Sequence, residues 1–281
     1  MTANQFGGRW TQDKLKVLQE YLDFYTKALK NQPFTLIYID CFAGTGRVKL
    51  TGHDAIIDGS ARIALNCEPG FDRYHFIESN RRHLAELQEL VNGHRHKDRC
   101  TIAQGDAAKL LWPLLNSYKD RWRDTRGVLF LDPFGLQCTW DMLQDIAATK
   151  ALDVFFWVSL SGLYRQAALK ANDIDKHKAA RLTRFLGTDG WLRALYAPDK
   201  QADLFSERAV VREQGWRPIL SFVTKRLGQA FPYVSQAYPM GASNNAPLYA
   251  LFFCCANPSG PAKALASRVS SEILGKLPVL R

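Results

Sequence analysis

Four acidic residues stand at or just beyond the ends of four apolar, strand-like segments of this sequence: Asp40, Glu78, Asp106 and Asp132. Strand-like runs separated by helical stretches predict a parallel sheet, and in such a sheet ligands bind outside the carboxyl ends of the strands. We therefore expect the four carboxylates at one edge of the sheet. There they can engage a ligand that carries hydroxyl, amino and cationic groups.

The first of these acids leads into a glycine turn, Asp40-Cys41-Phe42-Ala43-Gly44-Thr45-Gly46. Glycines let the main chain approach a ligand closely. A phosphate cradle would need Gly-x-x-x-x-Gly-Lys-Ser/Thr, and a dinucleotide fingerprint would need a third glycine where this chain has Lys49. We expect S-adenosylmethionine (SAM) as the cofactor instead, with Asp40 engaging its cationic aminoacyl end directly or through water. The expected loop contacts are Phe42, Gly44, Thr45 and Gly46.

Two further acids complete the expected cofactor site. Glu78 ends the second strand, where a carboxylate can accept both hydroxyls of an adenosine ribose. Asp106 opens the helix after the third strand, placed to accept a hydrogen bond from the adenine amino group, and the backbone N–H of Ala107 can pair with a ring nitrogen. Asp106 also suits the N-cap of that helix, and the two roles can coexist.

The fourth strand runs into Asp132-Pro133-Phe134-Gly135. This segment resembles the Asn/Asp-Pro-Pro-Tyr/Phe motif of SAM-dependent methyltransferases that act on amino groups of nucleobases, with one proline where that motif has two. It also looks like the corresponding segment of tRNA guanine-N2 dimethyltransferases. An exocyclic amine is a poor nucleophile because its lone pair is delocalised into the ring. The Asp132 carboxylate and the Pro133 carbonyl can each accept an amino proton and orient the nitrogen, while Phe134 can stack on the base.

The composition narrows the class of protein. The 281 residues carry a net charge of +10, which favours a polyanionic partner such as RNA or DNA. No run of 18 apolar residues occurs, so we expect no membrane span. The six cysteines are scattered without a Cys-x-x-Cys pair, which predicts reduced thiols in a cytoplasmic protein. We expect no metal site, because the histidine cluster His94-Arg95-His96 lies in a charged, loop-like stretch.

The order of elements predicts an α/β fold: a doubly wound, mostly parallel, seven-stranded Rossmann-like methyltransferase sheet. Within a basic region, residues 206–227 are expected to be helical. The very apolar run 248–255 favours a C-terminal hairpin that closes the main sheet, and the alternative is a separate winged-helix-like part. The expected segments are an N-terminal helical segment (1–33), a SAM-binding core (34–160), a basic helical region (161–230) and a C-terminal hairpin and helix (231–281).

In combination, six segments resemble the three-Cys-motif partner protein (TcmP) family: residues 37–47, 59–65, 76–78, 130–135, 147–150 and 185–188. The resemblance spans nearly the whole chain. It implies a SAM-dependent methyltransferase-like fold and a partner protein that carries a three-cysteine motif and resembles radical-SAM enzymes. It does not imply a substrate.

Three functions fit these patterns. The first is an enzyme that transfers a methyl group from SAM to an exocyclic amino nitrogen of a nucleobase in RNA or DNA. Its expected catalytic residues are Asp132, Pro133 and Phe134. The second is a methyltransferase that acts on a protein or a small molecule, and the third is a non-catalytic SAM- or nucleic-acid-binding partner of the three-cysteine protein. Strong, salt-sensitive binding of nucleic acid would separate the first from the second.

Overall fold

The computed structural model describes residues 4–5, 9–49, 56–198, 210–241 and 247–277. Among these residues, eight strands form the central sheet, namely β2 (Thr35–Asp40), β5 (Arg73–Glu78), β6 (Cys100–Gln104), β7 (Thr125–Leu131), β8 (Leu152–Ser159), β11 (Tyr233–Val234), β12 (Tyr238–Met240) and β13 (Tyr249–Cys255). The sheet order is β11-β13-β8-β7-β2-β5-β6, and β12 pairs with β13 beside that path.

Five neighbouring strands of this sheet, from β8 to β6, are parallel. β13 runs antiparallel to β8 along its whole length, with Tyr249 opposite Ser159 and Cys255 opposite Asp153. The C-terminal strand therefore closes the main sheet. The predicted doubly wound, mostly parallel sheet is confirmed: seven strands follow the path from β11 to β6, and β12 is an eighth that pairs with β13 beside it. The predicted domain boundaries stay a prediction.

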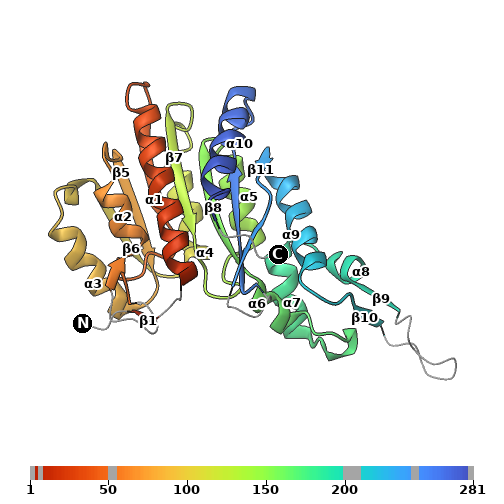
Figure 1. Ribbon diagram of the computed structural model, residues 1–281. Helices are drawn as coiled ribbons and strands as arrows, with labels where there is room; N and C mark the ends of the chain where they lie inside the picture. The colour runs from red at the N-terminus through yellow and green to blue at the C-terminus, as the bar shows by residue number, and fades with distance from the viewer. Residues whose placement is uncertain (1–3, 6–8, 50–55, 199–209, 242–246, 278–281) are drawn as a thin grey trace, which may run out of the picture.

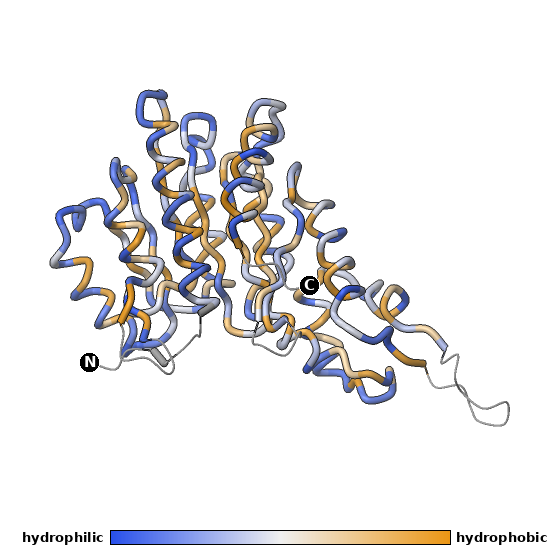
Figure 2. Tube along the Cα trace, in the orientation of Figure 1, coloured by the Kyte–Doolittle hydropathy of each residue, from blue (hydrophilic) through white to orange (hydrophobic). Residues whose placement is uncertain are grey.

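Helices cover both faces of the sheet (Figure 1). α1 (Arg9–Leu29), α2 (Ser60–Asn66), α3 (Arg81–Asn92) and α10 (Gly260–Leu274) bury their apolar residues against one face. The other face carries α4 (Ala107–Asn116), α5 (Trp140–Ala148) and α9 (Arg217–Ala230), packed with α6 (Leu160–Gln166), α7 (Lys176–Leu186) and α8 (Trp191–Leu195). Apolar residues concentrate along the central strands, and hydrophilic residues lie on the outer turns (Figure 2).

Short strands lie outside the main sheet, namely β1 (Asn4–Gln5), β3 (Arg47–Lys49), β4 (Ile56–Asp58), β9 (Tyr196–Pro198) and β10 (Val210–Arg212). The helix predicted over 206–227 is wrong at its start: β10 pairs with β9 there, and α9 begins only at Arg217. Residues 206–209 lie outside the described residues. Gly215 has a φ of +88°, a conformation that a helix cannot contain, so no helix continues through this residue. Pro218 suits the first turn of α9.

The parallel strands end at one edge of the sheet, which is the lower edge in Figure 1. Asp40 and Glu78 are the last residues of β2 and β5, and Asp132 directly follows β7. α6 and α7, from the segment between β8 and β13, lie at the same edge (Figure 1). None of the described helices is long and apolar enough to cross a membrane.

Candidate active site

Two pockets adjoin at the carboxyl edge of the sheet. The first, which we call the glycine-loop pocket, has a volume of about 390 Å³. The second, the Asp106 pocket, has a volume of about 310 Å³. Four residues line both and join them into one groove: Phe42, Glu78, Ser79 and Gln137. Each volume lies in the range of small-molecule sites.

Ten of the eleven predicted site residues line this groove. The glycine-loop pocket contains Phe42, Gly44, Thr45, Gly46, Glu78, Asp132, Pro133 and Phe134. The Asp106 pocket adds Asp106 and Ala107. The structure thus brings the expected cofactor residues and the expected acceptor residues to one place, and only Asp40 lies off the wall.

The glycine turn is a close-packed piece of main chain. Gly44 and Gly46 have φ angles of +60° and +73°, which favour glycine. A Cβ at Gly46 would collide with the Leu90 side chain, and a Cβ at Gly59 would lie 2.9 Å from the carbonyl carbon of Gly46. Gly59 is a site residue that sequence reasoning missed, although a glycine just before a helix is the available signal.

Glu78 ties together the two loops that form the groove. Its Oε2 accepts a hydrogen bond from the Gly44 N–H at 2.8 Å, and its Oε1 accepts one from the Asn80 N–H at 2.7 Å. His83 Nδ1 lies 3.7 Å from Oε1. Because each carboxylate oxygen has two lone pairs, Glu78 keeps acceptor capacity for the hydroxyls of a ligand.

Asp106 is the N-cap of α4, as predicted, with Oδ1 accepting from the Ala108 N–H at 3.0 Å. No described residue donates a hydrogen bond to its second oxygen. Arg184, exposed on α7, lines the same pocket. The pocket beside Ala107 therefore holds a carboxylate oxygen suited to an amino group and a cation from the segment between β8 and β13.

Asp40 lies under the glycine loop and is fully buried. Its Oδ1 accepts from the Phe42 N–H at 3.1 Å, and its Oδ2 accepts weakly from the Tyr38 hydroxyl at 3.4 Å. Burial raises the pKa of Asp40 to about 7, and hydrogen bonds from Ser60, Phe42 and Tyr38 oppose that rise. The predicted direct contact between Asp40 and the cofactor finds no support in this placement, because Asp40 is not on the pocket wall. Support of the loop, or contact through water, stays a prediction.

The acceptor side of the groove is built by Asp132, Pro133 and Phe134. The Phe134 ring is 63% exposed, so it is accessible to a stacking partner. The Phe134 N–H donates to Gln137 Oε1 at 3.0 Å, and Gly135 turns the chain with a φ of +64°. These contacts hold the turn while its ring faces outward.

Lys14 of α1 forms an ion pair with Asp132 through Nζ and Oδ2. Trp10 and Thr11 of α1 and Tyr249 of β13 line the same pocket. Sequence reasoning missed all four residues. The available signal is that Lys14 lies four residues from both Trp10 and Leu18, which places a lysine on the core-facing side of an amphipathic helix.

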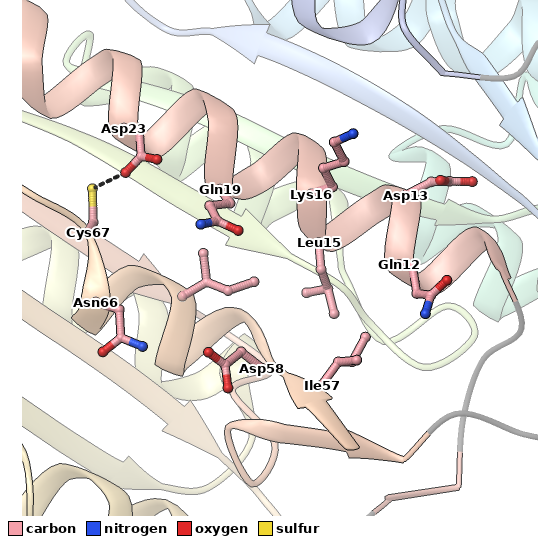
Figure 3. A pocket seen from close by; sticks show the side chains of 11 residues that line it. Gln12, Asp13, Leu15, Lys16, Gln19, Asp23, Ile57, Asp58, Asn66 and Cys67 are labelled. Carbon is pink, nitrogen blue, oxygen red and sulfur yellow. Dashed lines mark hydrogen bonds between the residues drawn. The ribbon is translucent and has the colours of Figure 1, made fainter. Parts of the chain in front are cut away.

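A further cavity of about 440 Å³ lies between α1 and the β4–α2 segment (Figure 3). A thiol, that of Cys67, lines this cavity and donates a hydrogen bond to Asp23 Oδ1 at 3.4 Å. Burial raises the pKa of Cys67 to about 11, so the thiol stays protonated and weakly nucleophilic at neutral pH. This cavity contains no residue of the glycine turn and is not a candidate active site.

No protein-family model matches this chain, and the comparison with curated proteins finds no match. Among solved structures, a Legionella pneumophila protein, LPL1258, has a TM-score of 0.48 at 11% identity, over 93% of this chain and 92% of that one. The N-terminal domain of EvdMO1 with S-adenosylhomocysteine (SAH) bound has a TM-score of 0.42 at 9% identity, over 84% of this chain and 79% of that one. The glycopeptide N-methyltransferase MtfA with SAH has a TM-score of 0.36 at 11% identity, over 89% and 92%.

Likeness at these scores carries no argument about activity. The fold is established by the sheet itself, since the order β11-β13-β8-β7-β2-β5-β6 with antiparallel β13 is that of the Rossmann-like methyltransferase fold.

Proposed function

We propose that this protein is a SAM-dependent methyltransferase that acts on an exocyclic amino nitrogen of a nucleobase in RNA or DNA. One observation carries the proposal: the Asp132-Pro133-Phe134 turn lines the same groove as the glycine turn and Glu78. Residues suited to hold an adenosyl cofactor and residues suited to orient an amine therefore adjoin.

The groove fits SAM along its length. The glycine turn would hold the aminoacyl end, Glu78 the ribose hydroxyls, and Asp106 with the Ala107 N–H the adenine. SAM supplies an electrophilic methyl group when bound. The left-handed glycines and the close approach of Gly59 to Gly46 support this fit, because they allow a tight turn of main chain beside a ligand.

The acceptor residues favour a nitrogen nucleophile. The Asp132 carboxylate and the Pro133 carbonyl would each accept an amino proton and so direct the nitrogen lone pair. As the new N–C bond forms, positive charge develops on the nitrogen, and the Asp132 carboxylate can remove that charge by taking the proton that leaves. The exposed Phe134 ring can stack on the base.

A polyanionic substrate is supported by charge. The chain carries +10, and Arg181 and Arg184 stand one turn apart on α7, both exposed. Arg184 lines the Asp106 pocket, so basic side chains lead from the outer surface into the groove. Lysine and arginine contacts to phosphates supply sequence-independent affinity for nucleic acid.

Two parts of the proposal rest on sequence. The resemblance to the TcmP family supports a partner protein that carries a three-cysteine motif and resembles radical-SAM enzymes. A cytoplasmic location is supported by the six cysteines, all of which are free thiols in the structure.

The test is transfer of labelled methyl from SAM to total RNA and to unmethylated DNA. Asp132→Asn should lower turnover at least about 100-fold, since it removes the carboxylate that takes the proton from the nitrogen, while SAH affinity stays within about twofold. Asp120→Ala, at an exposed acid before β7 and so at the opposite edge, is the matched control and should keep full activity. Turnover by Asp132→Asn at the wild-type rate would refute the assignment. No label in either pool, with SAH still bound, would favour a protein or small-molecule acceptor.

A further inference from the structure

Lys14 places a positive charge inside the acceptor side of the groove. The residue is only 7% exposed, and its Nζ contacts Asp132 Oδ2. The ammonium lies 5.5 Å from the Trp10 ring centre and 5.3 Å from that of Trp157, which is fully buried. Trp10 in turn stacks on Tyr249 at 4.9 Å. Aromatic rings and a carboxylate are the surroundings that stabilise an ammonium group.

This placement fixes the charge of the acceptor site. Asp132 alone would offer a carboxylate beside aromatic rings, which is a good binding site for an alkylammonium group such as a lysine side chain. With Lys14 paired to it, the two side chains together carry no net charge, which removes the attraction for an added cation, while the carboxylate keeps lone pairs that can accept a proton from a neutral amine. A second ammonium at Asp132 would meet a like charge at close range in a partly buried pocket, where such repulsion is only weakly screened.

A neutral amine escapes this penalty. The amino group of a nucleobase carries no charge, and it needs only an acceptor for its N–H. Lys14 donates to one carboxylate oxygen, and the carboxylate retains acceptor capacity for an amino proton. The Lys14–Asp132 pair therefore discriminates by charge, which is specificity gained through repulsion of the wrong partner.

We propose that Lys14 is a specificity-determining residue that restricts the acceptor to neutral amines and excludes alkylammonium groups. The inference rests on the proposed function and narrows its substrate class. It also makes α1, which precedes the glycine turn in the chain, a part of the acceptor site. The adjacent Thr11 hydroxyl is buried and has no hydrogen-bond partner among the described residues.

The experiment compares two ligands of the groove, SAH and sinefungin, by calorimetric titration. Sinefungin carries an ammonium group where SAM carries the transferred methyl, whereas SAH has neither. In wild-type protein, the charge of Lys14 should keep the affinity for sinefungin no higher than the affinity for SAH. In Lys14→Met the unpaired Asp132 should attract the ammonium, so the affinity for sinefungin relative to SAH should rise at least about tenfold.

Two variants serve as controls. Lys14→Arg keeps the charge and should keep the wild-type ratio, and Lys16→Met, at an exposed position on the same helix, should also leave it unchanged. Lys14→Gln replaces Lys14→Met if circular dichroism shows that the latter is unfolded.

A ratio in Lys14→Met within about twofold of wild type would overturn the role of Lys14, while leaving the methyltransferase assignment to the Asp132→Asn assay. If neither ligand binds wild-type protein, the groove is not a SAM site and both proposals fail. If the affinity for sinefungin relative to SAH rises as expected in Lys14→Met but no nucleic acid is methylated, the role of Lys14 is supported and the acceptor is a different neutral amine.

Discussion

Replacing Asp40 by Asn should stabilise the protein increasingly as the pH rises. Asp40 is fully buried, and burial raises its pKa from 3.8 to about 7, with hydrogen bonds from Ser60, Phe42 and Tyr38 opposing the rise and the charge of Asp132 adding to it. The folded protein thus holds this proton to a higher pH than the unfolded chain does. The free energy of unfolding of wild-type protein therefore falls as the pH rises through this range, whereas that of Asp40→Asn lacks this contribution.

The magnitude follows from the two pKa values. At 1.36 kcal/mol per pH unit, pKa values of 3.8 and about 7 correspond to roughly 4 kcal/mol over the full range. Most of it, roughly 2.5 kcal/mol, should be lost between about pH 5 and about pH 8. An Asn side chain still offers an oxygen to the Phe42 N–H, so the loop should keep its shape.

The assay is urea unfolding of wild-type protein and Asp40→Asn at about pH 5 and about pH 8. We expect the free energy of unfolding of the variant, relative to wild type, to rise by roughly 2.5 kcal/mol between these conditions. Glu272→Gln, at an exposed position of α10, is the control, and its difference from wild type should stay within about 0.5 kcal/mol. A constant or falling difference for Asp40→Asn would refute the reasoning, because it would mean that Asp40 is charged at little cost.

Two further predictions concern the groove. Gly46→Ala should cost about 1–2 kcal/mol of stability and lower the affinity for SAH about tenfold, because the residue has a φ of +73° and a Cβ there would collide with Leu90. Urea unfolding measures the stability and calorimetric titration measures the affinity. Wild-type affinity for SAH would contradict a close-packed loop. Phe134→Ala should change the free energy of unfolding by less than about 0.5 kcal/mol because its ring is exposed, yet raise KM for nucleic acid about tenfold through lost stacking. An unchanged KM would remove Phe134 from the substrate site.

Local patterns were enough to predict much of this fold. Apolar runs covered by helices on both sides predicted the buried parallel strands, because only a strand buried on both faces tolerates such a sequence. Asp106 was expected as an N-cap, and it caps α4. The segment around β10 was not predictable in this way. Its pairing with β9 and the burial of Arg212, whose Nε donates to the Ala167 carbonyl at 3.1 Å, depend on contacts distant in sequence.

For the site, the division is between residues on the strand ends and residues that arrive from elsewhere. The sequence by itself placed Glu78 and Asp132 at one sheet edge, because parallel strands bring their carboxyl ends together whatever the details of packing. Only the tertiary structure could decide that Asp40 lies beneath the loop, since its depth depends on how Ser60 and Phe42 pack over it.

Only the tertiary structure, likewise, could pair Lys14 with Asp132 across 118 positions of the chain. Helix periodicity puts Lys14 on the buried side of α1, but it does not say which carboxylate that side meets. That choice is made by the packing of α1 across the sheet next to β13, where Trp10 stacks on Tyr249. Local sequence patterns therefore determined the strands of the sheet and the cofactor-side residues at their carboxyl ends. Packing between segments distant in sequence decided the charge of the acceptor side.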